Sequence, residues 1–270
     1  MTPVIEYPSG SFKNVISHFL FLRSEEGDTH FSDRFIPDGH TALVINFSGI
    51  IHTNINGKRD LLPPAFIVPP AIRSLIVEGV PPIDSMVVIF KTTAFSKVFS
   101  QRMDLMNTRH FTPAGIIITT EQQGFIGSSG GNKERISRFE TVLSYHLHFN
   151  HYLPDTIDNI YETIHHSGGS LPVGSIPMQY GMNERTFRRL FRQRVGISAK
   201  SLSRIIRVSK LWEYMLHGCA VDFFDVICKF GFHDQSHLIR DFREIVGETP
   251  RSFFRRDHRQ ARMISGRNCE

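Results

Sequence analysis

Cysteine is scarce in this chain: Cys219, Cys228 and Cys269 are the only three in 270 residues, and none belongs to a Cys-x-x-Cys pair. Their number and spacing exclude a disulfide framework and a structural zinc module built from paired cysteines. No apolar run reaches the roughly 18 residues that a membrane-spanning helix requires. The first ten residues also lack the basic and apolar regions of a secretory signal. We therefore expect a soluble protein of a reducing cytoplasm that does not contact a membrane.

Motifs of enzyme chemistry are missing as well. The chain has fourteen histidines, but His146 and His148 would point to different faces of a helix, and His148 with His151 has no evident third ligand. Gly57-Lys58-Arg59 lacks the Ser/Thr and the spacing of a phosphate loop. Gly127-Ser128-Ser129-Gly130 lacks the strand–turn–helix setting of a nucleophile elbow. We expect no metal, no cofactor and no enzymatic activity.

The residues that are present can build a substantial core. Apolar residues make up 40% of the chain, charged residues 21%, and Phe alone occurs 23 times, which excludes disorder for the chain as a whole. The first half favours strands, and turn signals such as Asn56-Gly57 and Pro81-Pro82 separate them. The expected strands are Ile16–Leu22, Ala42–Phe47, Phe66–Pro69, Ser74–Val77 and Met86–Phe90. This pattern predicts a small barrel or sandwich, and of these we expect a β-rich, cupin-like barrel.

After the strands, the sequence pattern becomes typical of helices. We expect a short helix at Thr93–Gln101, a loop at Phe125–Asn132 and a longer helix at Glu134–Asn150. The longer helix has one apolar stripe, whose residues form either a dimer seam or a contact with the helix's own barrel; the seam would consist of Ile136, Phe139, Leu143 and Leu147. We divide the α+β chain into a β-rich effector or dimerisation domain (1–132), a helical linker (133–152), an all-α domain (153–256) and a tail (257–270).

Positive charge is concentrated in the second half. The net charge is +5, yet residues 1–150 carry thirteen basic and thirteen acidic groups, so the whole excess lies in residues 151–270. The excess of positive charge is largest in Gly181–Lys210, where nine basic residues accompany a single acid, Glu184. Such asymmetry suggests a polyanion as the partner of the second half.

Two segments in this half share one pattern: a short helix, a glycine turn, a polar N-cap and an amphipathic helix rich in hydrogen-bond donors. In the first segment, the short helix is Ser175–Tyr180, Gly181 makes the turn and Asn183 is the N-cap. The amphipathic helix follows at Glu184–Val195 and buries Phe187, Leu190, Phe191 and Val195. In the second, Asp222 caps Phe223–Phe230, Gly231 turns the chain, and Asp234 caps Gln235–Val246, which buries Leu238, Phe242 and Ile245. This is the pattern of a helix-turn-helix, used twice.

The exact amino-acid strings of the two segments indicate which kind of helix-turn-helix protein this is. The string FGFHDQSHLIRDFREIVGETPRSFFR, from Phe230 to Arg255, closely resembles the C-terminal signature of the AraC/XylS family of transcription regulators. MNERTFRRLFRQRVGIS, followed by Arg204–Leu216, is similar to the first motif and connecting helix of that family. The resemblance covers Leu153 to Arg255.

The resemblance implies a rigid helical domain in which one long helix, here Ile197–Leu216 with Trp212, holds two recognition helices side by side. They would enter successive major grooves roughly 34 Å apart. It implies as base-reading residues Arg185, Arg188, Arg189, Gln235, Ser236, His237 and Arg240, and as phosphate contacts Arg192 and Arg243.

Two positions depart from the family pattern: Pro177 and Ile227 stand where a small alanine is usual. Proline inside a helix costs about 3 kcal/mol, unless Ser175 caps a shortened helix in which Pro177 falls in the first turn. We therefore expect the second motif to contribute more to recognition than the first.

These observations predict a sequence-specific DNA-binding transcription regulator controlled by a ligand or a protein at its N-terminal domain. One alternative is a constitutive or protein-regulated factor whose N-terminal domain only dimerises. Another is a cupin-type enzyme with a DNA-binding tail, which would need a bound metal. The partner expected first is double-stranded DNA; RNA polymerase, an unknown small-molecule effector and a second copy of the chain are the others considered.

Overall fold

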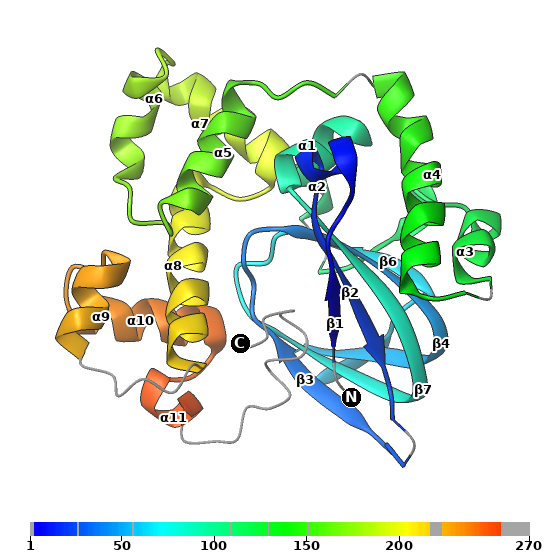
Figure 1. Ribbon diagram of the computed structural model, residues 1–270. Coiled ribbons are helices and arrows are strands. Elements are labelled where there is room, and N and C mark those ends of the chain that lie inside the picture. The colour runs from blue at the N-terminus through cyan, green and yellow to red at the C-terminus, as the bar shows by residue number, and fades with distance from the viewer. Residues whose placement is uncertain are drawn as a thin grey trace.

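The computed structural model describes residues 3–25, 27–55, 57–107, 110–128, 130–150, 152–216 and 223–254. These residues form an antiparallel sheet with helices packed on it, followed by a domain of helices (Figure 1). The fold class is α+β, as the sequence predicts, with the sheet in the first half of the chain and the helical domain in the second. The tail at 257–270 and the expected cap Asp222 lie outside the described residues.

The strands form one sheet in the order β1-β2-β7-β4-β6-β8, with β3 paired to β7 and β5 paired to β4. Their bounds are β1 Val4–Glu6, β2 Ile16–Arg23, β3 Phe31–Phe35, β4 Thr41–Ile55, β5 Lys58–Leu61, β6 Ala65–Val68, β7 Leu75–Phe90 and β8 Thr112–Pro113. The hairpin predicted at Asn56-Gly57 is confirmed, because Ile55 pairs with Lys58 across the turn; Asn56 itself lies outside the described residues.

Side chains alternate between the two faces of the sheet, as strand geometry requires. In β4, Leu43 and Ile45 belong to one apolar core, whereas Ala42 and Val44 belong to another on the opposite face. Helices cover the first face; they are α1 Thr92–Val98, α2 Met103–Met106, α3 Thr120–Gly127 and α4 Asn132–Asn150, with the short helices η1 Gly10–Asn14 and η2 Ala114–Ile116 beside them. The second face curves around an apolar cavity.

The prediction of a turn at Pro81-Pro82 is wrong. β7 runs without interruption from Leu75 to Phe90, so the two strands predicted on either side of the prolines are one. Its pairing with β4 shifts register between Ser48 and Ile50, opposite the prolines. Proline lacks a backbone N–H and is tolerated in a strand at such an irregularity. The Ser48 hydroxyl donates to the Pro82 carbonyl at 2.9 Å, which bridges the two strands at this point.

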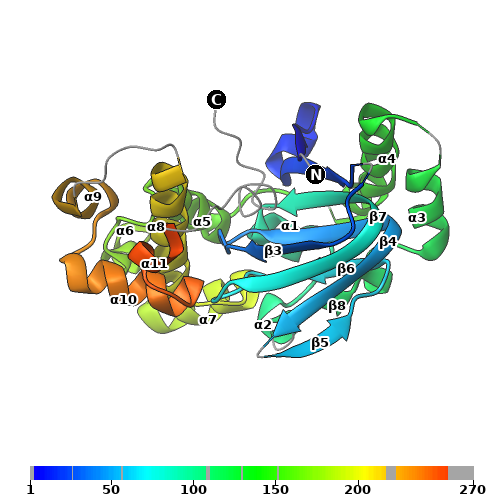
Figure 2. The ribbon, with the colours of Figure 1, turned by 90° about the horizontal axis from the view of Figure 1, so that it is seen from below.

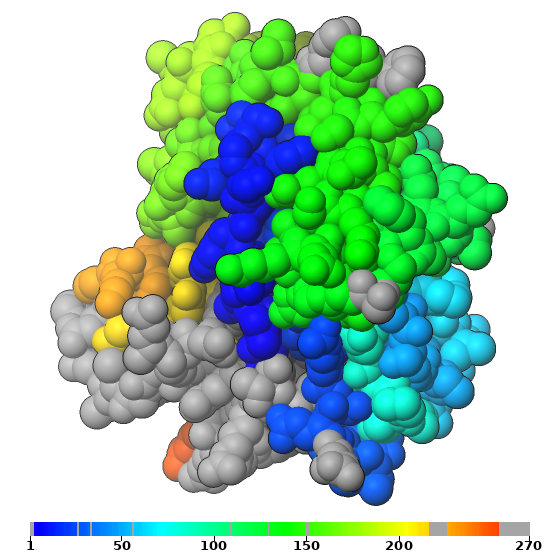
Figure 3. Space-filling model, turned by 45° about the vertical axis from the view of Figure 1, so that its right-hand side comes forward, coloured from blue at the N-terminus to red at the C-terminus, as the bar shows by residue number. Residues whose placement is uncertain are grey.

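Helix α4 confirms the helix predicted at Glu134–Asn150, but its apolar stripe faces the sheet. Ile136, Phe139 and Leu143 are buried in the core of the first domain, and Leu147 is partly buried against it. The segment that joins β1 and η1 lies beside the same helix (Figure 3), where the Ser9 backbone N–H donates to a Glu140 carboxylate oxygen at 3.1 Å. Ile136, Phe139 and Leu143 are therefore covered by the chain itself and are not exposed for a dimer seam.

The helical domain continues from α5 to α11. Its helices are α5 Thr156–His166, η3 Val173–Ser175, α6 Ile176–Gln179, α7 Glu184–Val195, α8 Ala199–Leu216, α9 Phe223–Phe230, α10 Gln235–Val246 and α11 Pro250–Phe254. The predicted connector is confirmed as α8, which runs between the two helix pairs (Figure 1). Trp212 of α8 is fully buried in a core that contains Phe191 of α7 and Phe242 of α10, so one helix holds both pairs together.

Charged side chains tie the two domains together. Arg194 of α7 donates to Asp155 at 2.9 Å, to Asp158 at 3.1 Å and to the Thr93 carbonyl of α1 at 2.9 Å. Burial alone would raise the pKa of Asp155, but Lys97 and Arg194 hold it far below its usual range. Ile36, from the loop after β3, is buried in the core of the helical domain. The position of the helical domain on the sheet is thus set by specific contacts.

Candidate nucleic-acid interface

The first helix pair is α6 and α7. Gly181, at φ +61°, makes the turn between them, in a conformation that favours glycine. Pro177 lies in the first turn of α6, where its missing N–H costs little, so the proline does not disrupt this pair. Ser175 precedes α6 without a side-chain capping bond. Asn183 is the predicted N-cap of α7, and its side-chain oxygen accepts from the Arg185 backbone N–H at 2.9 Å.

Helix α7 has one buried face and one cationic face. Phe187, Phe191 and Val195 are buried as predicted, whereas Leu190 is only partly buried. The four arginines expected to contact DNA are all exposed on the other side; they are Arg185, Arg188, Arg189 and Arg192. Arg188 and Arg192 also line a groove of about 470 Å³ beside the first turn of α8, together with Lys200.

The second helix pair, α9 and α10, repeats this construction. Gly231, at φ +68°, makes the turn, and Asp234 is the predicted N-cap, whose carboxylate accepts from the His237 backbone N–H at 2.7 Å. This bond, with a second from the His233 side chain, lowers the pKa of Asp234. Ile227 of α9, the second departure from the family pattern, is partly buried and packs against the domain core.

Helix α10 buries Leu238, Phe242 and Ile245 as the sequence predicts. Of the residues expected to contact DNA, Gln235, Ser236, Arg240 and Arg243 are exposed. His237 differs from them: its side chain is 24% exposed, and its Nε2 lies 3.1 Å from Oδ2 of Asp241. Its ring is therefore turned toward the protein and is less available to DNA than its neighbours.

Asp241 is a residue that the sequence reasoning missed. It is 1% exposed, and its carboxylate lies 2.9 Å from Arg204 and 3.7 Å from Arg207, both on α8. Burial lowers the pKa of Arg207, while a hydrogen bond to Glu244 raises that of Arg204. The 3.6-residue period of α10 places Asp241 on the buried stripe with Leu238 and Ile245, which is the signal that could have found it. Asp241 ties α10 to the connector and so sets its orientation.

Together these contacts place two similar helices on one scaffold. Figure 2 shows α7 and α10 on the same side of α8, each with its N-terminus preceded by a glycine turn. An α-helix fits the major groove of B-DNA, where Arg can bind guanine through two bonds and Gln can bind adenine. The remaining arginines and the free N–H groups at each helix start suit phosphates.

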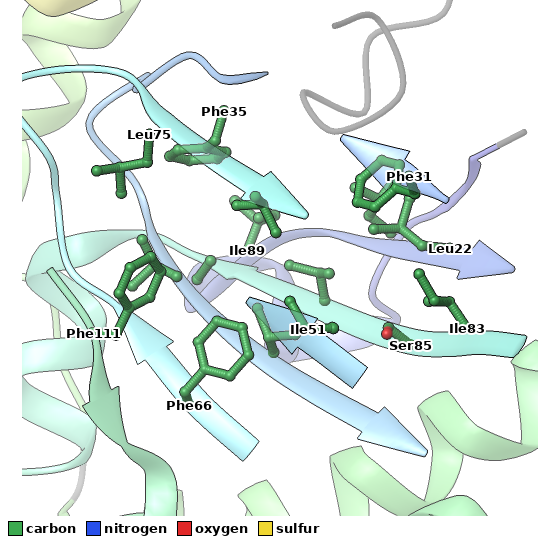
Figure 4. A pocket seen from close by; sticks show the side chains of 16 residues that line it. Leu22, Phe31, Phe35, Ile51, Phe66, Leu75, Ile83, Ser85, Ile89 and Phe111 are labelled. Atoms are coloured by element: carbon green, nitrogen blue, oxygen red, sulfur yellow. The ribbon is translucent and has the colours of Figure 1, made fainter. Parts of the chain in front are cut away.

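A separate candidate site lies inside the sheet. The cavity has a volume of about 70 Å³, and Ser85 contributes the one polar side chain to its lining. Figure 4 shows Phe31, Phe66, Phe111 and Ile89 among the side chains that surround it. Such a lining suits an apolar molecule and offers little to a charged one.

The described residues offer no metal centre, because they contain no group of three or more His, Cys, Asp or Glu side chains that could hold an ion. Within the same residues, no helix has both the length and the apolar character needed to cross a bilayer.

A family comparison agrees with the helix pairs described above. A family model described as a helix-turn-helix domain matches residues 178–256. No curated protein matches the sequence. Among solved structures, the chain is similar to ToxT from Vibrio cholerae, with 10% identity, a TM-score of 0.47 and coverage of 94% of this chain and 98% of that one. It is also similar to the AraC-like transcriptional activator CuxR, with 12% identity, a TM-score of 0.32 and coverage of 79% and 87%.

Proposed function

We propose that this chain, a DNA-binding transcription regulator with an AraC-type helix-turn-helix domain at residues 178–256, reads two successive major grooves with α7 and α10. The observation that carries the proposal is the pair of capped amphipathic helices held by α8, each with its basic side chains outward. Successive major grooves on one face of a duplex are roughly 34 Å apart. A single protein molecule would then read one asymmetric site.

The candidate DNA contacts fall into two groups according to their position along α7 and α10. We assign base contacts to the exposed side chains near the helix starts and on the outer face, which are Arg185, Arg188, Arg189, Gln235, Ser236 and Arg240, with His237 in a minor role. We assign phosphate contacts to Arg192 and Arg243, which lie farther along each helix. RNA polymerase is a further proposed partner, which would place the protein in the cytoplasm. Catalysis has no part in this function.

Arg240 and Arg243 test this division, because both are exposed on α10 and differ only in the proposed contact. We expect Arg240→Ala to cost about 1–3 kcal/mol on the preferred site and to relax preference at one base position. Arg243→Ala should weaken preferred and random duplexes by the same factor. The measurement is fluorescence anisotropy on a duplex selected from a random pool and on a random duplex. Equal losses on both duplexes for both variants would refute the assignment.

The apolar cavity supports control by a ligand. We propose that an apolar effector binds there, in preference to the constitutive alternative, because the lining offers about sixteen side chains and almost no polar group. That the protein forms a homodimer remains a prediction, and the apolar stripe of α4 is no longer proposed as its interface. Light scattering of the full chain at tens of micromolar would establish the oligomeric state.

Ligand binding to the folded state should raise its stability. We expect n-butanol, a short aliphatic probe suited to a cavity of about 70 Å³, to raise the melting temperature of the full chain in a concentration-dependent way. Ala42→Leu, which adds carbons to the cavity wall, should reduce that shift. If a panel of aliphatic alcohols, aliphatic acids and small aromatics changed neither the melting temperature nor DNA affinity, the constitutive alternative would be favoured.

A further inference from the structure

The connection between β6 and β7 docks on the end of α10. The Ser74 backbone N–H donates to the Ile245 carbonyl at 2.7 Å, and the Ser74 hydroxyl donates to the Val246 carbonyl at 2.9 Å. Arg34 of β3 donates to the same Val246 carbonyl at 2.6 Å. The last carbonyls of a helix have no partner within it, so these donors from the sheet domain satisfy them. The docking fixes the β6–β7 connection beside α10.

This docking creates a groove of about 790 Å³ between the two domains. Arg73 and Ser74 line it from the sheet side, and α10 lines the other side with Ser236, Ile239, Arg240, Arg243 and Glu244. Both ribbon views place α10 next to the end of the sheet (Figures 1 and 2). Arg73 therefore faces the same groove as two arginines that we assign to DNA contacts.

The groove carries uncompensated positive charge. In the described part of the chain, Arg73, Arg240 and Arg243 form no hydrogen bond or ion pair with another side chain, and all three are exposed. The one acid, Glu244, is already held by Arg204, whose hydrogen bond lowers the pKa of that carboxyl, with smaller contributions from Arg73 and Arg240. Three guanidinium groups line the groove, and its carboxylate is already bound by Arg204, so the groove favours an anion as its ligand. A guanidinium group can bind phosphate oxygens through two hydrogen bonds.

We propose that Arg73 of the sheet domain contacts a backbone phosphate of the DNA that α10 binds, so that both domains take part in DNA binding. This inference rests on the proposed function, since it takes DNA as the anion. DNA is the occupant that the groove favours, because the groove is continuous with the exposed face of α10. The position of Arg73 also links two sites, since Ser74 docks on α10 and Leu75 lines the apolar cavity.

A phosphate contact has a measurable signature. Each phosphate contact contributes about −0.9 to the slope of log K against log salt. For the full chain on a random 30-base-pair duplex, we expect Arg73→Ala to reduce the steepness of that slope by about one and to raise Kd about 3- to 10-fold at 100 mM KCl. Arg73→Lys, which keeps the charge, should retain most of the affinity. Lys133→Ala removes an exposed charge at the start of α4, on the far side of the sheet in Figure 1, and should leave binding unchanged.

The outcomes separate this inference from the function it rests on. If the wild-type chain binds no duplex even at low salt, the proposed function itself fails. If the wild type binds, Arg243→Ala weakens binding and Arg73→Ala behaves as Lys133→Ala does, only the inference about Arg73 is overturned. Tighter binding by Arg73→Ala would also overturn it, because the sheet domain would then shield α10. Melting curves of each variant should match the wild type, since Arg73 contacts no side chain that its loss would leave unpaired.

Discussion

Replacing Asp241 with alanine should lower the free energy of unfolding by about 3 kcal/mol and sharply weaken DNA binding. Asp241 is buried between α10 and α8, where Arg204, Arg207 and His237 surround its carboxylate. Removing the carboxylate leaves charged partners in a buried setting, which costs more than the loss of the pair itself. It also removes the buried ion pairs that help to hold α10 against the connector, so the orientation of α10 should become less fixed. Urea unfolding and anisotropy with duplex DNA measure the two effects.

Glu244→Ala is the matched control for this variant. Glu244 binds the same Arg204 and lies one turn from Asp241, but its side chain is 42% exposed. Ion pairs at the surface contribute about 0–1 kcal/mol, so this variant should be nearly as stable as the wild type. If Asp241→Ala were no less stable than Glu244→Ala, the role given to the buried carboxylate would be wrong.

The double variant Phe139→Glu with Leu143→Glu should unfold the sheet domain. Both side chains are almost fully buried against the sheet, at 3% and 1% exposure. Burying a carboxyl group without partners costs several kcal/mol even when it takes up a proton, and here two lie one helical turn apart. Circular dichroism and thermal unfolding of the full chain measure the loss.

Ser137→Glu with Thr141→Glu is the corresponding control, because these residues have the same spacing on the exposed side of α4. This variant should remain folded. If Phe139→Glu with Leu143→Glu instead gave a folded monomer from a dimeric wild type, α4 would be a dimer seam after all, and its packing on the sheet would not hold in solution.

Local features were predictable because their causes are local. The N-caps Asn183 and Asp234 each satisfy backbone N–H groups within three residues, so a short stretch of sequence suffices to place them. The hairpin between Ile55 and Lys58 depends on Gly57, whose φ of +82° favours glycine. Of the two alternatives that the sequence leaves open for Pro177, the structure shows the first-turn position, and only the distance of the proline from the helix start separates them.

Failures arose where a distant segment decides the outcome. Pro81-Pro82 indicates a turn in isolation, yet an irregular partner strand at Ser48 lets β7 continue through it. The apolar stripe of α4 predicts burial but cannot name the surface that buries it, and the sheet of the same chain does so. The period of α10 places Asp241 on the buried stripe, but it cannot name Arg204 and Arg207 of α8 as the partners that hold the buried carboxylate.

The sequence by itself determined the α+β class, the two capped amphipathic helices α7 and α10, the connector with Trp212, and the arginines and glutamine that face outward. Periodicity, caps and charge are properties of short segments, and the string from Phe230 to Arg255 carries them in a specific order. Only the tertiary structure decided that α4 packs on its own sheet, that Asp241 anchors α10, and that Arg73 shares a groove with Arg240. Each of these depends on which distant surfaces meet, because burial and ion pairing are energies of contacts between segments and not of the segments alone.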